Sequence, residues 1–238
     1  MEVAELWRFP VKSLGGERLQ HVSVGPGGLE GDRGWAIWDL RDGLGLTARR
    51  VPELLFASAS LSASGGVEIT LPDGEVATDD GVLSRWLGRP VELRDAATGG
   101  ERRYENTTDP EREADAPWQA FTGADGPFHD SPQARVTLLS TGSIGDWDRR
   151  RFRANVVLAG SGEDRLVGER VELGEAILAV RQQLGRCVMT TRAQPGGLER
   201  DLDVLRRIAR ERDNKLAVGA LVERGGTVQV GDRLERRA

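Results

Sequence analysis

The chain has 238 residues, with 38 acidic residues against 33 basic ones, so its formal net charge is −5, and it contains one cysteine. This length suits one large domain or two small ones, and one cysteine excludes an intrachain disulfide, an all-cysteine zinc site and an iron–sulfur cluster held by this chain alone. The acidic balance disfavours nucleic acid as a partner, because nucleic-acid surfaces usually carry net positive charge.

Short strands dominate the prediction for the first 95 residues. Gly- and Pro-containing turns separate segments that alternate or run apolar, at 3–9, 18–24, 34–40, 55–61, 67–71 and 91–96. One helix interrupts them, because Thr78 and the two aspartates after it can cap it, Val82 begins a helical spacing and Gly88 ends it. The pattern predicts a twisted sheet or small β-barrel.

Residues 99–135 are polar and rich in glycine, proline and acidic residues, with no sustained period. We predict a linker or long loop packed on the second lobe. A structureless stretch of this length inside a compact protein is usually mobile or functional.

Strands and two helices are predicted for the second half. Apolar runs at 135–139, 155–160, 170–182 and 220–234 indicate strands, and helices are expected from Ser140 or Thr141 through Arg151 and over 199–212. The fold class is therefore mainly β with a few helices (α+β). It divides into a β-barrel-like lobe at 1–98, the linker at 99–135 and a second β-barrel lobe at 136–238. The chain lacks the glycine-rich loops of dinucleotide and P-loop folds.

The sequence shows no pattern of a targeting signal or a membrane span. No apolar run approaches the length of a membrane span, and residues 1–9 lack the charged-then-apolar pattern of a secretory signal. We expect a cytoplasmic protein with no membrane span.

The segment Gln183–Gly196 holds the single cysteine, Cys187, beside Arg186. A guanidinium group next to a thiol favours the thiolate, which binds a soft metal or attacks an electrophile. A free cysteine is also among the residues most often buried as a small hydrophobe. Spacing alone leaves both interpretations open.

Arginines cluster at Arg149–Asn155, before an apolar strand. If the strand has already begun there, Arg151 and Arg153 share a face and could clamp a phosphate or carboxylate. A solvated, charged helix end is the alternative. Upstream, Ser140 and Thr141 stand at a predicted helix N-terminus, which suits either an anion or simple capping.

Two turns in the first lobe carry further candidates. Lys12, one of only two lysines, lies with Ser13 in a glycine-terminated turn, and Arg33 lies in an acid-and-glycine turn. Two histidines exclude a histidine-rich metal site. His129 next to Asp130 is an acid/base pair or an ordinary turn.

In order along the chain, these pieces resemble the MOSC family, named from the C-terminal domain of molybdenum cofactor sulfurase, together with its N-terminal β-barrel domain, as in the mitochondrial amidoxime-reducing component. The resemblance covers nearly the whole chain. It rests on FPVKS, GDRGW, Thr47–Arg49, LLSTGS, FRAN, CVMTT and GTVQVGD.

The resemblance implies a protein that binds the molybdenum cofactor, in which a pterin dithiolene holds molybdenum. It makes Cys187 the metal-binding and catalytic residue. Pyridoxal phosphate binding enters only as a label of the family as a whole. The implied cofactor-contacting residues are Lys12, Ser13, Arg33, Ser140, Thr141, Arg153, Asn155 and Arg186.

The implied activity is reduction of N-hydroxylated small molecules. Because some relatives carry a fused iron–sulfur domain and this chain lacks the cysteines for one, electrons would come from a separate ferredoxin- or flavin-type reductase. The alternative is a sulfur or cofactor carrier that holds a persulfide on Cys187. One departure concerns a tyrosine that the eukaryotic members use near the C-terminal strands, since Tyr104 is the only tyrosine here.

Overall fold

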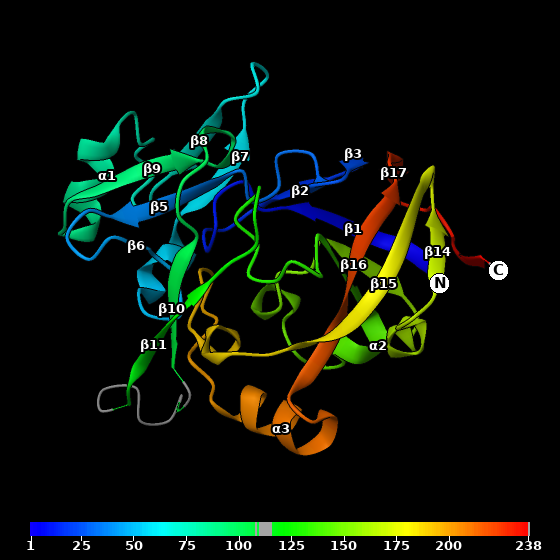
Figure 1. Cartoon of the computed structure of the whole chain (residues 1–238). Coiled ribbons are helices and arrows are strands. Elements are labelled where there is room, and N and C mark those ends of the chain that lie inside the picture. Colours follow the sequence, from blue (N-terminus) through cyan, green and yellow to red (C-terminus); the bar gives the residue numbers. More distant parts are fainter. Residues whose placement is uncertain (108, 110–115, 238) are drawn as a thin grey trace.

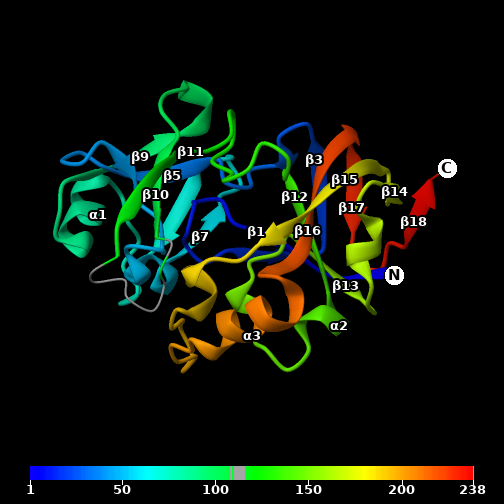
Figure 2. The ribbon, with the colours of Figure 1, turned by 60° about the horizontal axis from the view of Figure 1, so that its bottom comes forward.

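The structure, a computed structural model, describes residues 1–107, 109 and 116–237, and these form mostly strands with three α-helices (Figure 1). The main sheet curls into a half-barrel (Figure 2). The predicted fold class, mainly β in an α+β arrangement, is confirmed. In sheet order the eight strands are β18 (Leu234–Arg237), β14 (Arg170–Leu173), β15 (Ala176–Gly185), β16 (Lys215–Arg224), β12 (Val136–Ser140), β13 (Val156–Ala159), β1 (Glu2–Arg8) and β2 (Glu17–Leu19).

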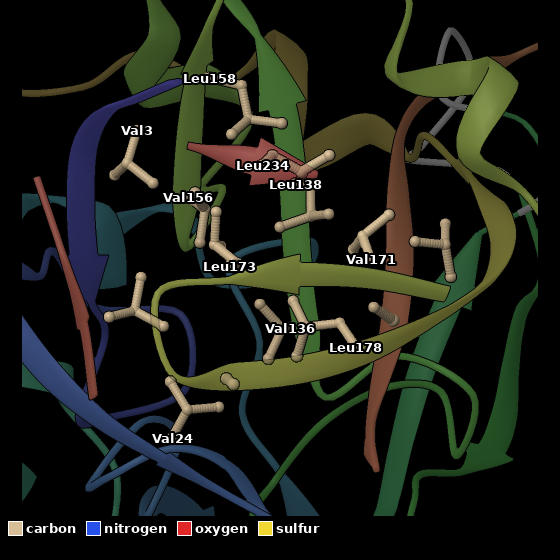
Figure 3. Packing of buried hydrophobic residues seen from close by; sticks show 14 of the residues in the cluster. Val3, Val24, Val136, Leu138, Val156, Leu158, Val171, Leu173, Leu178 and Leu234 are labelled. Carbon is tan, nitrogen blue, oxygen red and sulfur yellow. The ribbon is translucent and has the colours of Figure 1, made fainter. Parts of the chain in front are cut away.

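Apolar side chains from seven of the eight strands of this half-barrel form one hydrophobic core, together with side chains from the three strands of a smaller sheet. In Figure 3 the side chains of Val3, Leu138 and Leu173 point toward one another from β1, β12 and β14. Leu138 and Leu173 are fully buried. Burying such a side chain stabilises the fold by about 1.5–3 kcal/mol relative to leaving it exposed.

Smaller sheets make up the rest of the molecule. They are β6-β5-β9, β7-β8, β17-β3-β4 and β10-β11. Their strands are β3 (His21–Gly25), β4 (Gly28–Leu29), β5 (Trp35–Asp39), β6 (Leu44–Gly45), β7 (Ser58–Leu61), β8 (Val67–Thr70), β9 (Val91–Asp95), β10 (Arg103–Thr107), β11 (Trp118–Thr122) and β17 (Gly226–Gln229).

Helix α1 (Asp80–Leu87) confirms the helix predicted in the first lobe. The Asp79 side chain accepts a hydrogen bond from the Val82 amide at 3.0 Å, and Gly88 ends the helix with φ of 64°. Val82 and Leu83 are buried in the first-lobe core. Local signals are enough to fix this element.

The first strands of the chain complete the sheets of the second half. Strand β1 pairs with both β13 and β2, and β3 pairs with β17 near the C-terminus. The two sequence halves are therefore interleaved. Leaving β1 at Arg8, the chain passes directly into the turn that carries Lys12 and Ser13, so this turn lies at the junction of the lobes.

The helix predicted through Arg151 is wrong in its length. Helix α2 (Thr141–Ile144) ends after one turn at Gly145, whose φ of 59° and ψ of −126° leave the helical region. A separate 3-10 turn, Arg149–Arg151, is capped by the Asp148 side chain. The later helix, α3, spans Asp203–Arg212 and begins after the predicted start. Among the described residues, no helix is long and apolar enough to cross a membrane.

The segment 99–135, expected to be a long loop, contains the hairpin β10–β11. Tyr104 and Phe128 are fully buried and pack with Trp38 of β5, in the first lobe. The residues of this segment are mostly polar, but these few aromatic side chains fix it to β5. Part of the segment, 108 and 110–115, lies outside the described residues.

Gly45 makes room for Tyr104. A Cβ at Gly45 would lie 2.3 Å from the Cε1 atom of Tyr104, closer than real Cβ contacts allow. We expect Gly45→Ala to lower the free energy of unfolding by about 1–3 kcal/mol, measured by urea denaturation. Gly34→Ala is the matched control, because its nearest neighbour is 3.7 Å away. An equal loss in both variants would contradict the packing explanation.

Candidate functional site

A cavity of about 460 Å³ lies where the two lobes meet. Its walls come from the turns after β1 and before β5 on one side, and from the segments after Arg151 and after β15 on the other. Residues far apart in sequence therefore face one space. The sequence-predicted residues that line it are Lys12, Ser13, Arg33, Arg153, Arg186 and Cys187.

Cys187 lies two residues after the end of β15 and directly before the 3-10 turn Val188–Thr191. The Thr190 hydroxyl donates to the Cys187 carbonyl at 3.0 Å, and the Thr191 hydroxyl donates to the Val188 carbonyl at 2.8 Å. Both threonines are buried, while Cys187 is partly exposed. The two hydroxyls thus fold the turn that presents the thiol to the cavity.

Asp130 joins two buried cations on the first-lobe side. Its carboxylate pairs with the Lys12 ammonium and with the Arg49 guanidinium, and it is 46 % exposed where it faces the cavity. Lys12 Nζ also donates to the Phe128 carbonyl at 2.8 Å and lies 4.2 Å from the centre of the Tyr104 ring. The hairpin segment and the Lys12 turn are locked together by these contacts.

Burial and neighbouring charges shift the pKa values of Lys12 and Asp130 in opposite directions. Burial lowers the pKa of Lys12 to about 8, although Asp130 opposes the shift. Burial alone would raise the pKa of the Asp130 carboxyl, but Arg49 and Lys12 hold it well below its usual range. The carboxylate stays charged and keeps both cations in place.

Three cavity residues adopt left-handed backbone conformations that residues other than glycine rarely take. Ser13 has φ of 72°, Arg33 of 53° and Arg153 of 50°. Hydrogen bonds hold two of them: the Ser13 hydroxyl accepts from the Ala48 amide at 3.0 Å, and Arg153 donates to the Leu14 carbonyl. Such strain is concentrated at functional sites.

Positive charge dominates the cavity wall. Five cationic side chains and one carboxylate, Asp130, line it among the described residues. Burial, with Arg33 beside it, lowers the pKa of Arg153, and burial lowers that of Arg186, yet a guanidinium stays charged at neutral pH. The buried Nε atoms of Arg49 and Arg186 have no hydrogen-bond partner in the described part of the chain. The cavity therefore suits an anionic group that accepts hydrogen bonds.

Three predicted site residues lie outside this cavity. The Ser140 side chain accepts from the Ser143 amide and caps α2. The Thr141 hydroxyl donates to the Gly160 carbonyl and accepts from the Gly160 amide. Asn155 is fully buried and links the Thr137 amide to the Trp7 carbonyl. Capping and strand bridging account for all three side chains.

The shared strand face expected for Arg151 and Arg153 is not formed, because β13 begins only at Val156. Arg153 reaches the cavity, whereas Arg151 turns away from it and donates to the carbonyls of Thr190, Arg192 and Glu199. Arg151 thus anchors the segment that follows Cys187.

Sequence reasoning missed Arg49 and Asp130 as site residues. Arg49 lies in the Thr47–Arg49 motif, and the prediction for Asp130 concerned only its neighbour His129. In the structure the His129 ring bonds to the Gly27 carbonyl at 3.2 Å, and burial lowers its pKa to about 3, so it is neutral. The sequence around Asp130 does not indicate that its side chain pairs with Lys12, which lies far away in the chain.

Lys12 makes the anion affinity of the cavity depend on pH. As the pH rises through about 8, Lys12 loses its proton and the cavity loses one positive charge. We expect sulfate, whose charge is constant over this range, to bind about tenfold more weakly at about pH 9.5 than at about pH 7, measured by calorimetry. In Lys12→Gln the sulfate affinity should be nearly the same at both pH values. If the affinity of that variant still falls about tenfold, a group other than Lys12 causes the pH dependence.

No cluster of three or more histidine, cysteine, aspartate or glutamate side chains that could hold a metal ion is found in the described ranges. Cys187 is instead neighboured by the cationic side chains of Arg49 and Arg186.

Comparison with known proteins gave two domain matches. Residues 1–98 match the MOSC N-terminal beta barrel domain, and residues 125–235 match the MOSC domain. A search of curated protein sequences gave no match.

Solved structures with a similar chain path include the YuaD protein from Bacillus subtilis, at 10 % identity over 98 % of this chain and 93 % of that one, with a TM-score of 0.45. A structure described as a hypothetical protein has 11 % identity over 100 % and 68 % of the two chains, with a TM-score of 0.46. The YiiM protein from Geobacillus stearothermophilus has 14 % identity over 56 % and 72 %, with a TM-score of 0.36.

Proposed function

The chain belongs to the MOSC-domain family, whose domains are associated with the molybdenum cofactor, and from this premise we propose that it binds that cofactor in the cavity around Cys187. One observation carries the proposal: a single thiol meets five cationic side chains, drawn from both lobes, in one cavity. A thiolate suits a soft metal, and guanidinium and ammonium groups suit a phosphate.

The residues present fit the group. Cys187 would be the sulfur ligand that the protein supplies, beside the dithiolene of the pterin. The unpartnered Nε atoms of Arg49 and Arg186 are donors that an anionic cofactor can satisfy. Lys12, Arg33 and Arg153 would hold its phosphate and pterin, with Ser13 and Asp130 fixing the turn and the ammonium group.

We propose that the reaction is reduction of an N-hydroxylated small molecule. The N–O bond breaks, the oxygen leaves as water, and two electrons and two protons enter. When bound, the cofactor supplies this two-electron oxygen-atom transfer. Because the chain has one cysteine, the electrons would come from a separate ferredoxin- or flavin-type reductase. The chain's own part is to hold the cofactor's charge and fix its orientation.

Elemental analysis and pterin fluorescence test the proposal on protein purified from a molybdenum-replete host. We expect molybdenum and pterin in equal amounts, up to one of each per chain. Absence of both would overturn the proposal. If mass spectrometry then finds one added sulfur atom on the Cys187 peptide, the protein is a sulfur carrier instead.

A further inference from the structure

A second cavity, of about 550 Å³, shares a wall with the first. Asn106, Arg186 and Cys187 line both cavities, so the thiol is reached from two sides. The second cavity lies between strand β10 and helix α3. Figure 2 shows helix α3 below strand β16. The proposed function uses only the first cavity.

Helix α3 gives the second cavity an apolar floor. Val204 and Ile208 are buried on one side of the helix, against the core that includes Leu216. Leu202, Leu205 and Ala209 recur at the spacing of a helical face and line the cavity instead. Arg186, Arg206 and Asp109 also line this cavity, so its aliphatic surface lies beside charged groups.

Asn106 supplies an unsatisfied acceptor at the shared wall. It lies two residues after Tyr104 in β10, so both side chains leave the same face of the strand, the face that Lys12 contacts. The Oδ1 atom of Asn106 is buried and accepts no hydrogen bond from any described residue. A buried carbonyl oxygen without a donor costs free energy, which a ligand carrying an O–H or N–H group would recover.

We propose that the second cavity is the substrate pocket, that it takes a small molecule with an apolar aryl or alkyl body and a terminal O–H donor, and that Asn106 accepts the hydrogen bond of this hydroxyl beside Cys187. The inference rests on the proposed function, whose N-hydroxylated substrates have this shape. It adds that the two ligands occupy different cavities: the cationic cavity holds the cofactor, and the α3 cavity holds the substrate and determines which substrates the protein accepts.

Calorimetric binding of two ligands tests the pocket without turnover. Benzamidoxime carries the O–H donor, and its O-methyl ether lacks it. We expect purified wild-type protein to bind benzamidoxime about tenfold more tightly than the ether. Asn106→Leu should remove this preference, and Leu205→Glu should weaken binding of both ligands at least about tenfold. Arg103→Gln, an exposed residue on the opposite face of β10, should change neither.

Molybdenum content, measured on the same samples, separates the two proposals. We expect Leu205→Glu and Arg103→Gln to keep the wild-type content, since neither residue lines the cofactor cavity. The pocket is refuted if Asn106→Leu keeps the preference for benzamidoxime, or if Leu205→Glu binds both ligands as the wild type does. Protein without molybdenum and pterin that still shows the expected binding pattern would refute the proposed function and leave the pocket standing.

Discussion

Cys187→Ser is expected to reduce the molybdenum content of the purified protein to less than about one-tenth of the wild-type value. A serine hydroxyl has nearly the shape of the thiol but is a hard, poorly ionised ligand that does not replace a thiolate at a soft metal. The turn should survive, because its hydrogen bonds use the Cys187 carbonyl and the Thr190 hydroxyl. Elemental analysis, with a thermal melt to verify folding, measures the outcome.

Thr141→Val is the matched control for this experiment. The family resemblance makes Thr141 a cofactor contact, whereas the structure places its hydroxyl on Gly160, outside the cavity. We expect that variant to keep its molybdenum. Full metal content in Cys187→Ser would sink the assignment of the thiol as ligand, and loss of metal in Thr141→Val would show that the cofactor extends to α2.

Elements whose causes are local were predictable from the sequence. Helix α1 carries its own cap at Asp79 and its own stop at Gly88, and both act as predicted. The pairing of β1 with β13 was not predictable, because the two strands are separated by most of the chain and neither encodes its partner. Register of this kind is set by the whole sheet rather than by a local signal.

The residues of the candidate site also fall into those that the sequence predicted and those that it did not. Family motifs pointed to Lys12, Arg33 and Cys187, which do share one cavity. Asp130 lies in a segment predicted to be a loop and was considered only as a partner of His129. Its contact with Lys12 forms when the hairpin segment packs on Trp38. A residue type tells what chemistry is available, while the partner depends on long-range packing.

Arg151→Met is expected to lower the free energy of unfolding by about 2–4 kcal/mol and to weaken retention of the cofactor. Arg151 is 5 % exposed and donates to three carbonyls in the segment after Cys187. Methionine fills similar space but leaves those buried acceptors without a donor. Denaturant unfolding measures the first effect, and molybdenum content after dialysis measures the second.

Arg149→Met separates anchoring from simple loss of charge. Arg149 lies in the same 3-10 turn, but it is 32 % exposed and pairs with Glu5. Partly exposed ion pairs contribute about 1 kcal/mol or less, so this variant should lose little stability and keep its metal. Equal losses in the two variants would mean that the arginine-rich turn acts through its charge. A loss confined to Arg151→Met would mean that a buried arginine outside the cavity holds in place the turn that carries Cys187, the proposed metal ligand.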